Sequence, residues 1–240
     1  MPNQYFQFKK FTVQQEKCSL KVCTDSCLFG AWIASAIEDK NISAETILDI
    51  GTGTGLLSLM LAQKSNAEID AVEINKSAFE EATENVNASP WNNQIRIFNA
   101  DIKKWKAPLK YDLVIANPPF YENDLLPENE AKNVAKHSAA LSLEDLVVIS
   151  KNLLNEDGTF AVLLPWHRTR LLENISSEHS FFIKEKKEVK QTPSHAYFRT
   201  MLILQKQKAG TLENELTIKN NDNEYSREYK DLLKDYYLYL

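Results

Sequence analysis

Four consecutive residues, Asn117-Pro118-Pro119-Phe120, combine the groups needed to hold a planar amino group for chemistry. They follow an apolar run, 111–116, that has the length and β-branched content of a strand. The prolines remove backbone donors and keep the chain extended, so the carbonyls of Asn117 and Pro118 can point into a cleft. With the Asn117 side-chain oxygen they can bind both hydrogens of an NH2 group, while Phe120 stacks on its ring. A proline-bounded loop is the plainer interpretation, but the flanking residues favour a catalytic site.

A glycine-rich loop, Gly51-x-Gly53-x-Gly55, lies between a strand-like and a helix-like segment. Glycines permit a tight turn and let a ligand approach the backbone closely. The dinucleotide-binding fingerprint places its third glycine one residue later, where this chain has Leu56. Asp49, just before the loop, would suit a cationic ligand and repel a pyrophosphate. The loop therefore favours a cationic cofactor over a dinucleotide.

Two acidic residues follow the next strand-like segments. Glu73 can accept hydrogen bonds from both hydroxyls of a ribose, although a solvated carboxylate at a strand end is the simpler alternative. Asp101 can accept from an adenine amino group, with Ile102 against the ring. With the glycine loop, these positions predict a site for S-adenosylmethionine. Its sulfonium already activates the leaving group, so we expect no metal.

The segments that must position these residues alternate between strand-like and helix-like from residue 45 onward, which predicts a mostly parallel sheet with helices on both faces. We expect strands over 46–50, 68–73, 94–98, 111–116 and 159–164, and helices over 56–63, 77–86 and 143–154, the last closed by Asp157-Gly158. Residues 181–189 and 197–205 are expected to form a terminal antiparallel hairpin. The prediction is a seven-stranded, Rossmann-like α/β fold.

The chain of 240 residues is expected to form one domain. Residues 1–44 form an N-terminal lid or substrate segment with a helix over 28–37, 45–206 the core, and 207–240 a C-terminal strand and docking helix. The segment 121–140 is too long for a tight connection, and loops of this length usually carry function.

Composition narrows the class of protein. Hydrophobic residues make up 43% and charged residues 25%, as in ordinary globular proteins. We find neither a membrane-length apolar stretch nor a signal core, so a soluble cytoplasmic protein is expected. Cys18, Cys23 and Cys27 lack a metal-ligand spacing and are interpreted as reduced thiols. The net charge of −5 argues against indiscriminate nucleic-acid binding, and the lysine clusters at 9–21, 103–110 and 184–190 are interpreted mainly as solvated faces.

The glycine loop, Glu73, Asp101 and the 117–120 tetrapeptide together resemble a class I S-adenosylmethionine-dependent methyltransferase that modifies amino groups. Outside this core the chain is similar to the tRNA1(Val) adenine-N6 methyltransferases through the segments 8–13, 18–22, 24–25, 30–32, 89–91, 225–229 and 237–238. That resemblance implies methylation of the adenine just 3′ of the anticodon. It also implies that Lys21, Thr24 and Asp25 lie over the cofactor.

The chain departs from this family at three positions. Cys23 stands where glycine is expected, Cys27 where an aliphatic residue is expected, and Lys136 where an arginine is usual. The first two affect the geometry of the N-terminal lid, and the third affects bidentate phosphate contact.

The substrate implied by the resemblance is the anticodon stem-loop of a tRNA, bound by a protein expected to be a monomer. We expect an RNA-facing set that combines phosphate contacts with base stacking. Its members are Lys9, Lys10, Phe11, Tyr121, Lys132, Lys136, His137, Trp166, His167, Arg168 and Arg170. For Trp166, ordinary packing at a helix end is an equally simple interpretation.

Several other functions remain open at this point. Methylation of a glutamine amide in a protein, or of guanine N2 in RNA, would use a similar tetrapeptide, and DNA adenine methylation would need a larger target-recognition domain. A non-enzymatic alternative is a cofactor-binding RNA chaperone or assembly factor. A nicotinamide oxidoreductase is disfavoured by the glycine spacing.

Overall fold

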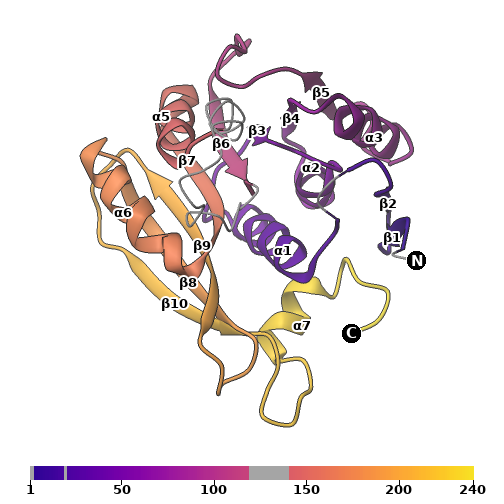
Figure 1. Cartoon of the computed structure of the whole chain (residues 1–240), viewed down its shortest axis with the longest axis vertical. Helices are drawn as coiled ribbons and strands as arrows, with labels where there is room; N and C mark the ends of the chain where they lie inside the picture. Colours follow the sequence, from indigo (N-terminus) through magenta and orange to yellow (C-terminus); the bar gives the residue numbers. More distant parts are fainter. Residues whose placement is uncertain (1–2, 19–20, 119–140) are drawn as a thin grey trace, which may run out of the picture.

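The computed structural model describes residues 3–18, 21–118 and 141–240, which are organised around one large mixed sheet (Figure 1). Its strands are β3 (Thr46–Ile50), β4 (Glu68–Glu73), β5 (Ile95–Asn99), β6 (Tyr111–Ala116), β7 (Leu154–Pro165), β8 (Phe182–Lys190), β9 (Tyr197–Gln205) and β10 (Leu212–Thr217). They lie in the order β10-β8-β9-β7-β6-β3-β4-β5. Strands β3 to β7 are parallel to one another, while β9 is antiparallel to both β7 and β8. Strand β10 is parallel to β8.

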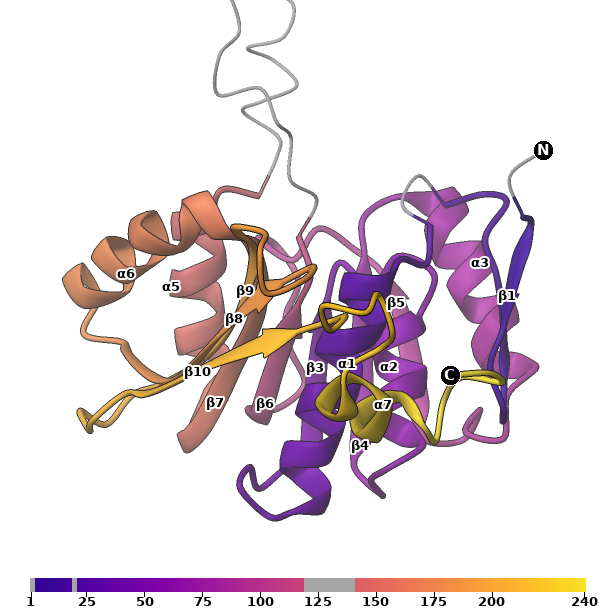
Figure 2. The ribbon, with the colours of Figure 1, turned by 90° about the horizontal axis from the view of Figure 1, so that it is seen from below.

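Helices cover both faces of this sheet (Figures 1 and 2). Successive strand residues point to opposite faces. In β3, Ile47 packs with α1 (Thr24–Glu38), α2 (Leu56–Ala62) and α7 (Arg227–Leu233). Leu48, on the other face, packs with α5 (Leu143–Leu153) and α6 (Thr169–Glu178). Helix α3 (Lys76–Asn87) joins the first cluster through Val86. Among the described residues, none of the helices is long and apolar enough to span a membrane.

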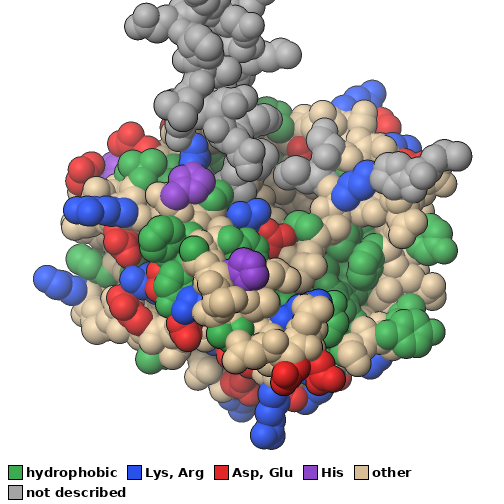
Figure 3. Space-filling model, turned by 60° about the horizontal axis from the view of Figure 1, so that its bottom comes forward, with side chains coloured by type: hydrophobic (Ala, Val, Ile, Leu, Met, Phe, Trp, Pro, Cys, Tyr) green, Lys and Arg blue, Asp and Glu red, His purple; other side chains and the backbone are tan. Residues whose placement is uncertain are grey.

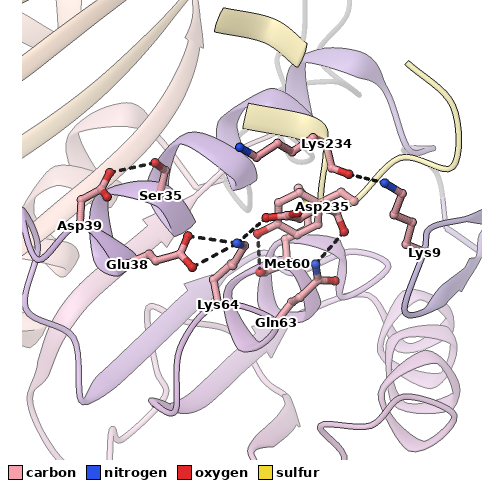
Figure 4. A network of polar contacts seen from close by, with 10 residues as sticks. Lys9, Ser35, Glu38, Asp39, Met60, Gln63, Lys64, Lys234 and Asp235 are labelled. Carbon is pink, nitrogen blue, oxygen red and sulfur yellow. Dashed lines mark hydrogen bonds and ion pairs between the residues drawn. The ribbon is translucent and has the colours of Figure 1, made fainter. Parts of the chain in front are cut away.

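The N-terminal and C-terminal segments meet on the helical face that carries α1. Residues near the N-terminus form a small antiparallel sheet, β1 (Tyr5–Gln7) and β2 (Thr12–Gln14), which the sequence analysis did not predict. The turn between them reaches the segment after α7, where the backbone N–H of Lys9 donates to the Tyr236 carbonyl at 2.8 Å and its side chain to the Lys234 carbonyl. Figure 4 shows Lys64 bridging Glu38 and Asp235 beside this junction, at 3.0 and 2.6 Å.

The sequence predicted the α/β class and the main strands, but the details differ in three places. The large sheet has eight strands among the described residues instead of seven, because β10 adds to its edge. The hairpin is present, with its second strand, β9, inserted between β7 and β8. Helix α5 ends at Leu153, so Asp157-Gly158 does not close it and lies inside β7. A Cβ on Gly158 would be 2.9 Å from the Tyr111 carbonyl oxygen, so the glycine serves close strand pairing beside a register shift.

Candidate active site

Four parallel strands place the candidate residues at one edge of the sheet. Strands β6, β3, β4 and β5 are neighbours with the same direction, so their carboxyl ends lie together. From β3 the chain adds β4 and β5 on one side of that strand, and it then returns to add β6 and β7 on the other side of β3. Such a switch point is where ligands bind in open α/β sheets. The structure therefore brings together the glycine loop, Glu73, Asp101 and Asn117, as the sequence predicted.

The glycines of the loop after β3 have a left-handed backbone conformation, which costs free energy for any residue with a side chain. Gly51, Gly53 and Gly55 have φ angles of 71°, 56° and 82°. The Gly51 N–H donates to the Val72 carbonyl at 2.8 Å, which ties the loop to β4. Among the described residues, a Cβ built on Gly51 would meet nothing within 4 Å, so no described atom fills the space beside this part of the loop. A ligand can therefore approach the loop backbone directly.

Asp49 lies behind this loop and is fully buried. Its Oδ2 accepts hydrogen bonds from the hydroxyls of Thr52 at 2.6 Å and Ser58 at 2.7 Å, whereas its Oδ1 has no partner among the described residues. Burial raises the pKa of the carboxyl from 3.8 to about 6, despite the two hydroxyl donors. Asp49 thus braces the loop against α2 and places a buried negative charge behind it.

Glu73, at the end of β4, is linked to the glycine loop by its side chain. Its Oε2 accepts from the Gly53 N–H at 2.9 Å and its Oε1 from the Asn75 N–H at 2.8 Å. Only 8% of the residue is exposed. Each carboxylate oxygen can accept a second hydrogen bond, so the pair can still receive two hydroxyl groups. The fixed position excludes the interpretation of Glu73 as a freely solvated side chain.

Two neighbours of Glu73 were missed by the sequence analysis. Asn99, the last residue of β5, donates from its side chain to the Glu73 carbonyl at 2.8 Å and so ties the two strand ends together. Ile74 is 62% exposed, which is unusual for a large apolar side chain at a strand end. An isoleucine directly after a strand-terminal acid was the available signal for an exposed apolar side chain at this edge.

Asp101 and Ile102 follow β5 and begin a turn. Asp101 Oδ1 accepts from the Lys103 N–H at 3.0 Å, and its main-chain carbonyl accepts from Trp105 at 2.8 Å. The Asp101 side chain is 29% exposed and lies 3.9 Å from the Lys104 ammonium. Ile102 is partly buried against the face that carries α5. The carboxylate therefore stays accessible at the ligand edge.

Asn117 follows β6, and its amide orientation is fixed by a contact with α1. The Nδ2 donates to the Ser26 hydroxyl at 2.9 Å. The amide oxygen consequently lies on the opposite side of the group, away from Ser26. Pro118 is half-buried beside it. The predicted residues Phe120, Tyr121, Lys132, Lys136 and His137 lie outside the described residues.

The residues expected over the cofactor lie at or just before the N-terminus of α1. Asp25 accepts from Arg199 on β9, with 2.6 Å between Nε and Oδ2, and also from the Ser26 N–H at 3.1 Å. Thr24 is exposed in the same turn, and Lys21 is exposed with its ammonium 3.4 Å from the Asn3 carbonyl. Arg199 was missed, although an arginine in the otherwise mostly apolar run 197–204 was a visible signal.

Trp166 lies at the same edge, in the short 3-10 helix η1 (Trp166–Arg168) that follows β7. Its ring is 44% exposed and stacks on Tyr197 with 6.0 Å between centroids. Its indole N–H donates to Glu188 Oε1 at 2.6 Å, so the ring is held in place while one face remains available. Arg168 is half-buried, and His167 and Arg170 are exposed beside it. The edge next to the end of β6 therefore carries Trp166, His167, Arg168 and Arg170.

Lys9 and Lys10 do not lie at this edge. Lys9 binds the segment after α7, and Lys10 lines a surface hollow with Glu38, Lys64 and Asp235. Glu38 ends α1 and Lys64 follows α2, so both lie where the chain returns to begin a strand, at the opposite edge from Asn117. The stacking role expected for Phe11 is wrong, because its ring is 6% exposed and packs on Phe8 at 4.5 Å.

The lysines of β8 are largely neutralised by acidic neighbours. Lys186, Lys187 and Lys190 form ion pairs at 3.0, 2.7 and 3.1 Å with Glu213, Glu228 and Glu215 respectively. Basic and acidic side chains are interspersed over the face drawn in Figure 3. The side chains of Lys186, Lys187 and Lys190 are only 16%, 12% and 20% exposed, so this cluster is a mixed-charge surface of paired groups and not a freely solvated row of lysines.

Comparison with known proteins identifies the family. Residues 30–165 match the methyltransferase small domain family. A tRNA1(Val) (adenine(37)-N6)-methyltransferase from Christiangramia forsetii is 37% identical over 245 residues, covering 100% of both chains. One of the same name from Pseudoalteromonas translucida is 38% identical, covering 97% of this chain and 98% of the relative. The chain belongs to the tRNA1(Val) (adenine(37)-N6)-methyltransferase family.

Solved structures of other methyltransferases have the same fold as this chain. A protein from Agrobacterium tumefaciens, described as a predicted O-methyltransferase, superposes with a TM-score of 0.68 at 15% identity, covering 88% of this chain and 96% of that one. A methyltransferase from Pyrococcus furiosus superposes with a TM-score of 0.53 at 23% identity, covering 73% of this chain and 83% of that one. At these identities the likeness establishes the methyltransferase fold alone.

Proposed function

We propose that this methyltransferase transfers a methyl group from S-adenosylmethionine to N6 of the adenine just 3′ of the anticodon of a valine tRNA. The amide of Asn117 carries the chemical part of this assignment. With its Nδ2 on Ser26, the amide presents its oxygen as an acceptor at the ligand edge of the sheet. An acceptor at that position suits an amino group. The choice of tRNA rests on the full-length relatives that carry this name.

The residues at the edge fit S-adenosylmethionine, which when bound supplies an electrophilic methyl group on a sulfonium. The described part of the chain leaves open space beside Gly51, and both Glu73 oxygens retain acceptor capacity for ribose hydroxyls. Asp101 is accessible for an adenine amino group, with Ile74 and Ile102 as apolar surfaces for its ring. The buried charge of Asp49 favours a cation near the loop.

The chain's own contribution to methyl transfer is orientation of the target amine. The lone pair of adenine N6 is delocalised into the ring, so the amine is a poor nucleophile. Acceptance of its hydrogens by the Asn117 side-chain oxygen and the Pro118 carbonyl favours a tetrahedral nitrogen with its lone pair localised. Orientation of this kind can supply several kcal/mol. A strong base is not required, because the N6 proton becomes acidic only after the methyl group has been transferred.

The target base has to leave its stack to reach this edge, which costs less in an anticodon loop than in a duplex. We assign ring stacking on the target to Phe120 and contacts with neighbouring nucleotides to Tyr121, Trp166 and Arg168. Lys136 and His137 are proposed phosphate contacts. Lys9 and Lys10 lie on the opposite edge, so they can serve only a distant part of a tRNA.

Transfer of labelled methyl to unmodified valine tRNA, followed by nucleoside analysis, tests this proposal. N6-methyladenosine next to the anticodon is the expected product. Labelled N2-methylguanosine would show that the target base is guanine and not adenine. Label on a protein glutamine but on no tRNA would show that the substrate is a protein. Cofactor binding with no transfer to either would favour an RNA chaperone.

Substitution of Asn117 by alanine tests the role of the amide. We expect Asn117→Ala to lower the transfer rate at least about 100-fold, because acceptor geometry at the reacting amine is lost. Cofactor affinity, measured by calorimetry, should stay within about twofold, because Glu73 and the glycine loop are unchanged. Loss of cofactor binding in this variant would contradict the role assigned to the amide.

A further inference from the structure

We infer that Ser26 is a positioning residue for methyl transfer: its hydroxyl holds the Asn117 amide in the orientation that turns the oxygen toward the target amine. This inference rests on the proposed function and adds a residue to the same site. Ser26 lies in the first turn of α1, 91 residues away from Asn117 in sequence, and is 6% exposed.

The amide needs such a partner because its two ends are almost the same size. Rotation by half a turn exchanges oxygen and nitrogen with little steric change, so hydrogen-bond partners decide the orientation. An amide with its NH2 toward the target would place donors against the two N–H groups of adenine. The bond from Asn117 Nδ2 to Ser26 Oγ, at 2.9 Å, selects the productive orientation.

The Ser26 hydroxyl can accept from Asn117 and at the same time donate its own proton to another partner. Ser26 Oγ lies 2.9 Å from the Cys23 sulfur, so a chain of hydrogen bonds can run from the Asn117 amide through Ser26 to Cys23. In the reverse direction the thiol would donate to Ser26 and Ser26 to the amide oxygen. That arrangement needs the opposite amide orientation, which sets donor against donor at the target amine, so the bound amine reinforces the direction that runs from Asn117 to Ser26.

The position of Ser26 is itself secured from two sides. Its backbone N–H donates to Asp25 Oδ1 at 3.1 Å, and Asp25 Oδ2 accepts from Arg199 on β9 at 2.6 Å. The Asp25 side chain is 15% exposed and that of Arg199 29%, so solvent screens this ion pair only in part. The first turn of α1 is therefore held between the end of β6 and the start of β9, with Ser26 facing Asn117.

The test compares Ser26→Ala with wild type in single-turnover assays with enzyme in excess, where slow transfer remains measurable. We expect the transfer rate to fall about 5- to 10-fold, as for loss of one orienting hydrogen bond, with tRNA and cofactor affinities within about twofold of wild type. Ser26→Thr, which keeps the hydroxyl, should restore most of the rate. Ser150→Ala is the matched control, because Ser150 is a buried serine as well but its hydroxyl has no partner among the described residues.

A double-mutant cycle separates positioning from a structural role. Both oxygens of a carboxylate accept hydrogen bonds, so turning the side chain by half a turn changes nothing. In the Asn117→Asp background, Ser26 therefore has no side-chain orientation to select. Ser26→Ala should then change the remaining rate by less than about twofold. An equal loss in both backgrounds, a wild-type rate for Ser26→Ala, or a loss that follows cofactor affinity would overturn the inference. Absence of transfer by the wild-type protein would instead overturn the proposed function.

Discussion

The buried carboxyl of Asp49 should make the protein less stable as the pH rises, and replacement by asparagine should remove that dependence. Burial raises its pKa in the folded protein from 3.8 to about 6. Between these two values the folded state binds more protons than the unfolded state, so the free energy of unfolding falls with increasing pH. A shift of this size corresponds to about 3 kcal/mol, and about 1.4 kcal/mol of it falls between about pH 5 and pH 8.

Chemical denaturation of wild type and Asp49→Asn at several pH values measures this effect. The free energy of unfolding of wild type should decrease by about 1.4 kcal/mol more than that of the variant between about pH 5 and pH 8. The difference in slope is the informative quantity. In the variant, the side-chain oxygen can still accept from Thr52 and Ser58, and any cost of burying its NH2 group is independent of pH. Parallel pH profiles for the two proteins would refute the assignment.

The Asp49→Asn variant also tests whether the buried carboxylate of Asp49 contributes to cofactor binding. Asp49→Asn should bind S-adenosylmethionine more weakly near neutral pH, because the buried charge that favours the sulfonium is lost. Affinity for S-adenosylhomocysteine, a neutral thioether, should change much less. An equal loss for both ligands would indicate that Asp49 acts only by holding the loop.

Three further substitutions test the loop, the ribose-binding acid and the proposed RNA surface. Gly55→Ala should lower the free energy of unfolding by about 1–2 kcal/mol in urea titrations, because the φ angle of Gly55 is 82°. Gly210→Ala should be nearly neutral, because Gly210 has no positive φ and no described atom lies within 4 Å of the added Cβ. Glu73→Gln should weaken cofactor binding by about tenfold in calorimetry, because an NH2 group would face a backbone N–H; unchanged affinity would argue against the ribose contact. Trp166→Ala should raise KM for tRNA by about 5- to 10-fold without affecting cofactor affinity, whereas Leu171→Ala, also exposed, should not.

The sequence predicted the central strands well because parallel strands buried on both faces appear as continuous apolar runs. It also predicted the shared edge of the candidate residues, since carboxyl ends of neighbouring parallel strands must meet. It could not predict contacts that depend on how helices dock. Ser26 and Asn117 are 91 residues apart, and Asp25 and Arg199 are 174 apart. Neither pair has a local pattern that would reveal it.

The errors near the N-terminus have the same origin. Lys9, Lys10 and Phe11 were assigned to the RNA-facing set because lysines next to an aromatic ring suit phosphate contacts and base stacking. The hairpin of β1 and β2 instead carries its turn to the edge opposite Asn117. An aromatic ring next to lysines has the composition of an RNA-binding surface, but its burial is decided by tertiary packing.

The junction of the two chain ends has a consequence for synthesis on the ribosome. Tyr236 is 1% exposed, its hydroxyl donates to the Met60 carbonyl at 3.0 Å, and its own carbonyl accepts from the Lys9 N–H. Because domains begin to fold while translation proceeds, the sheet can form before these last residues emerge. The N-terminal hairpin then lacks its docking partner until Tyr236 has been synthesised and has left the ribosome. A chain that lacks α7 and Tyr236 therefore exposes residues of α1 and α2 that are buried in the same cluster.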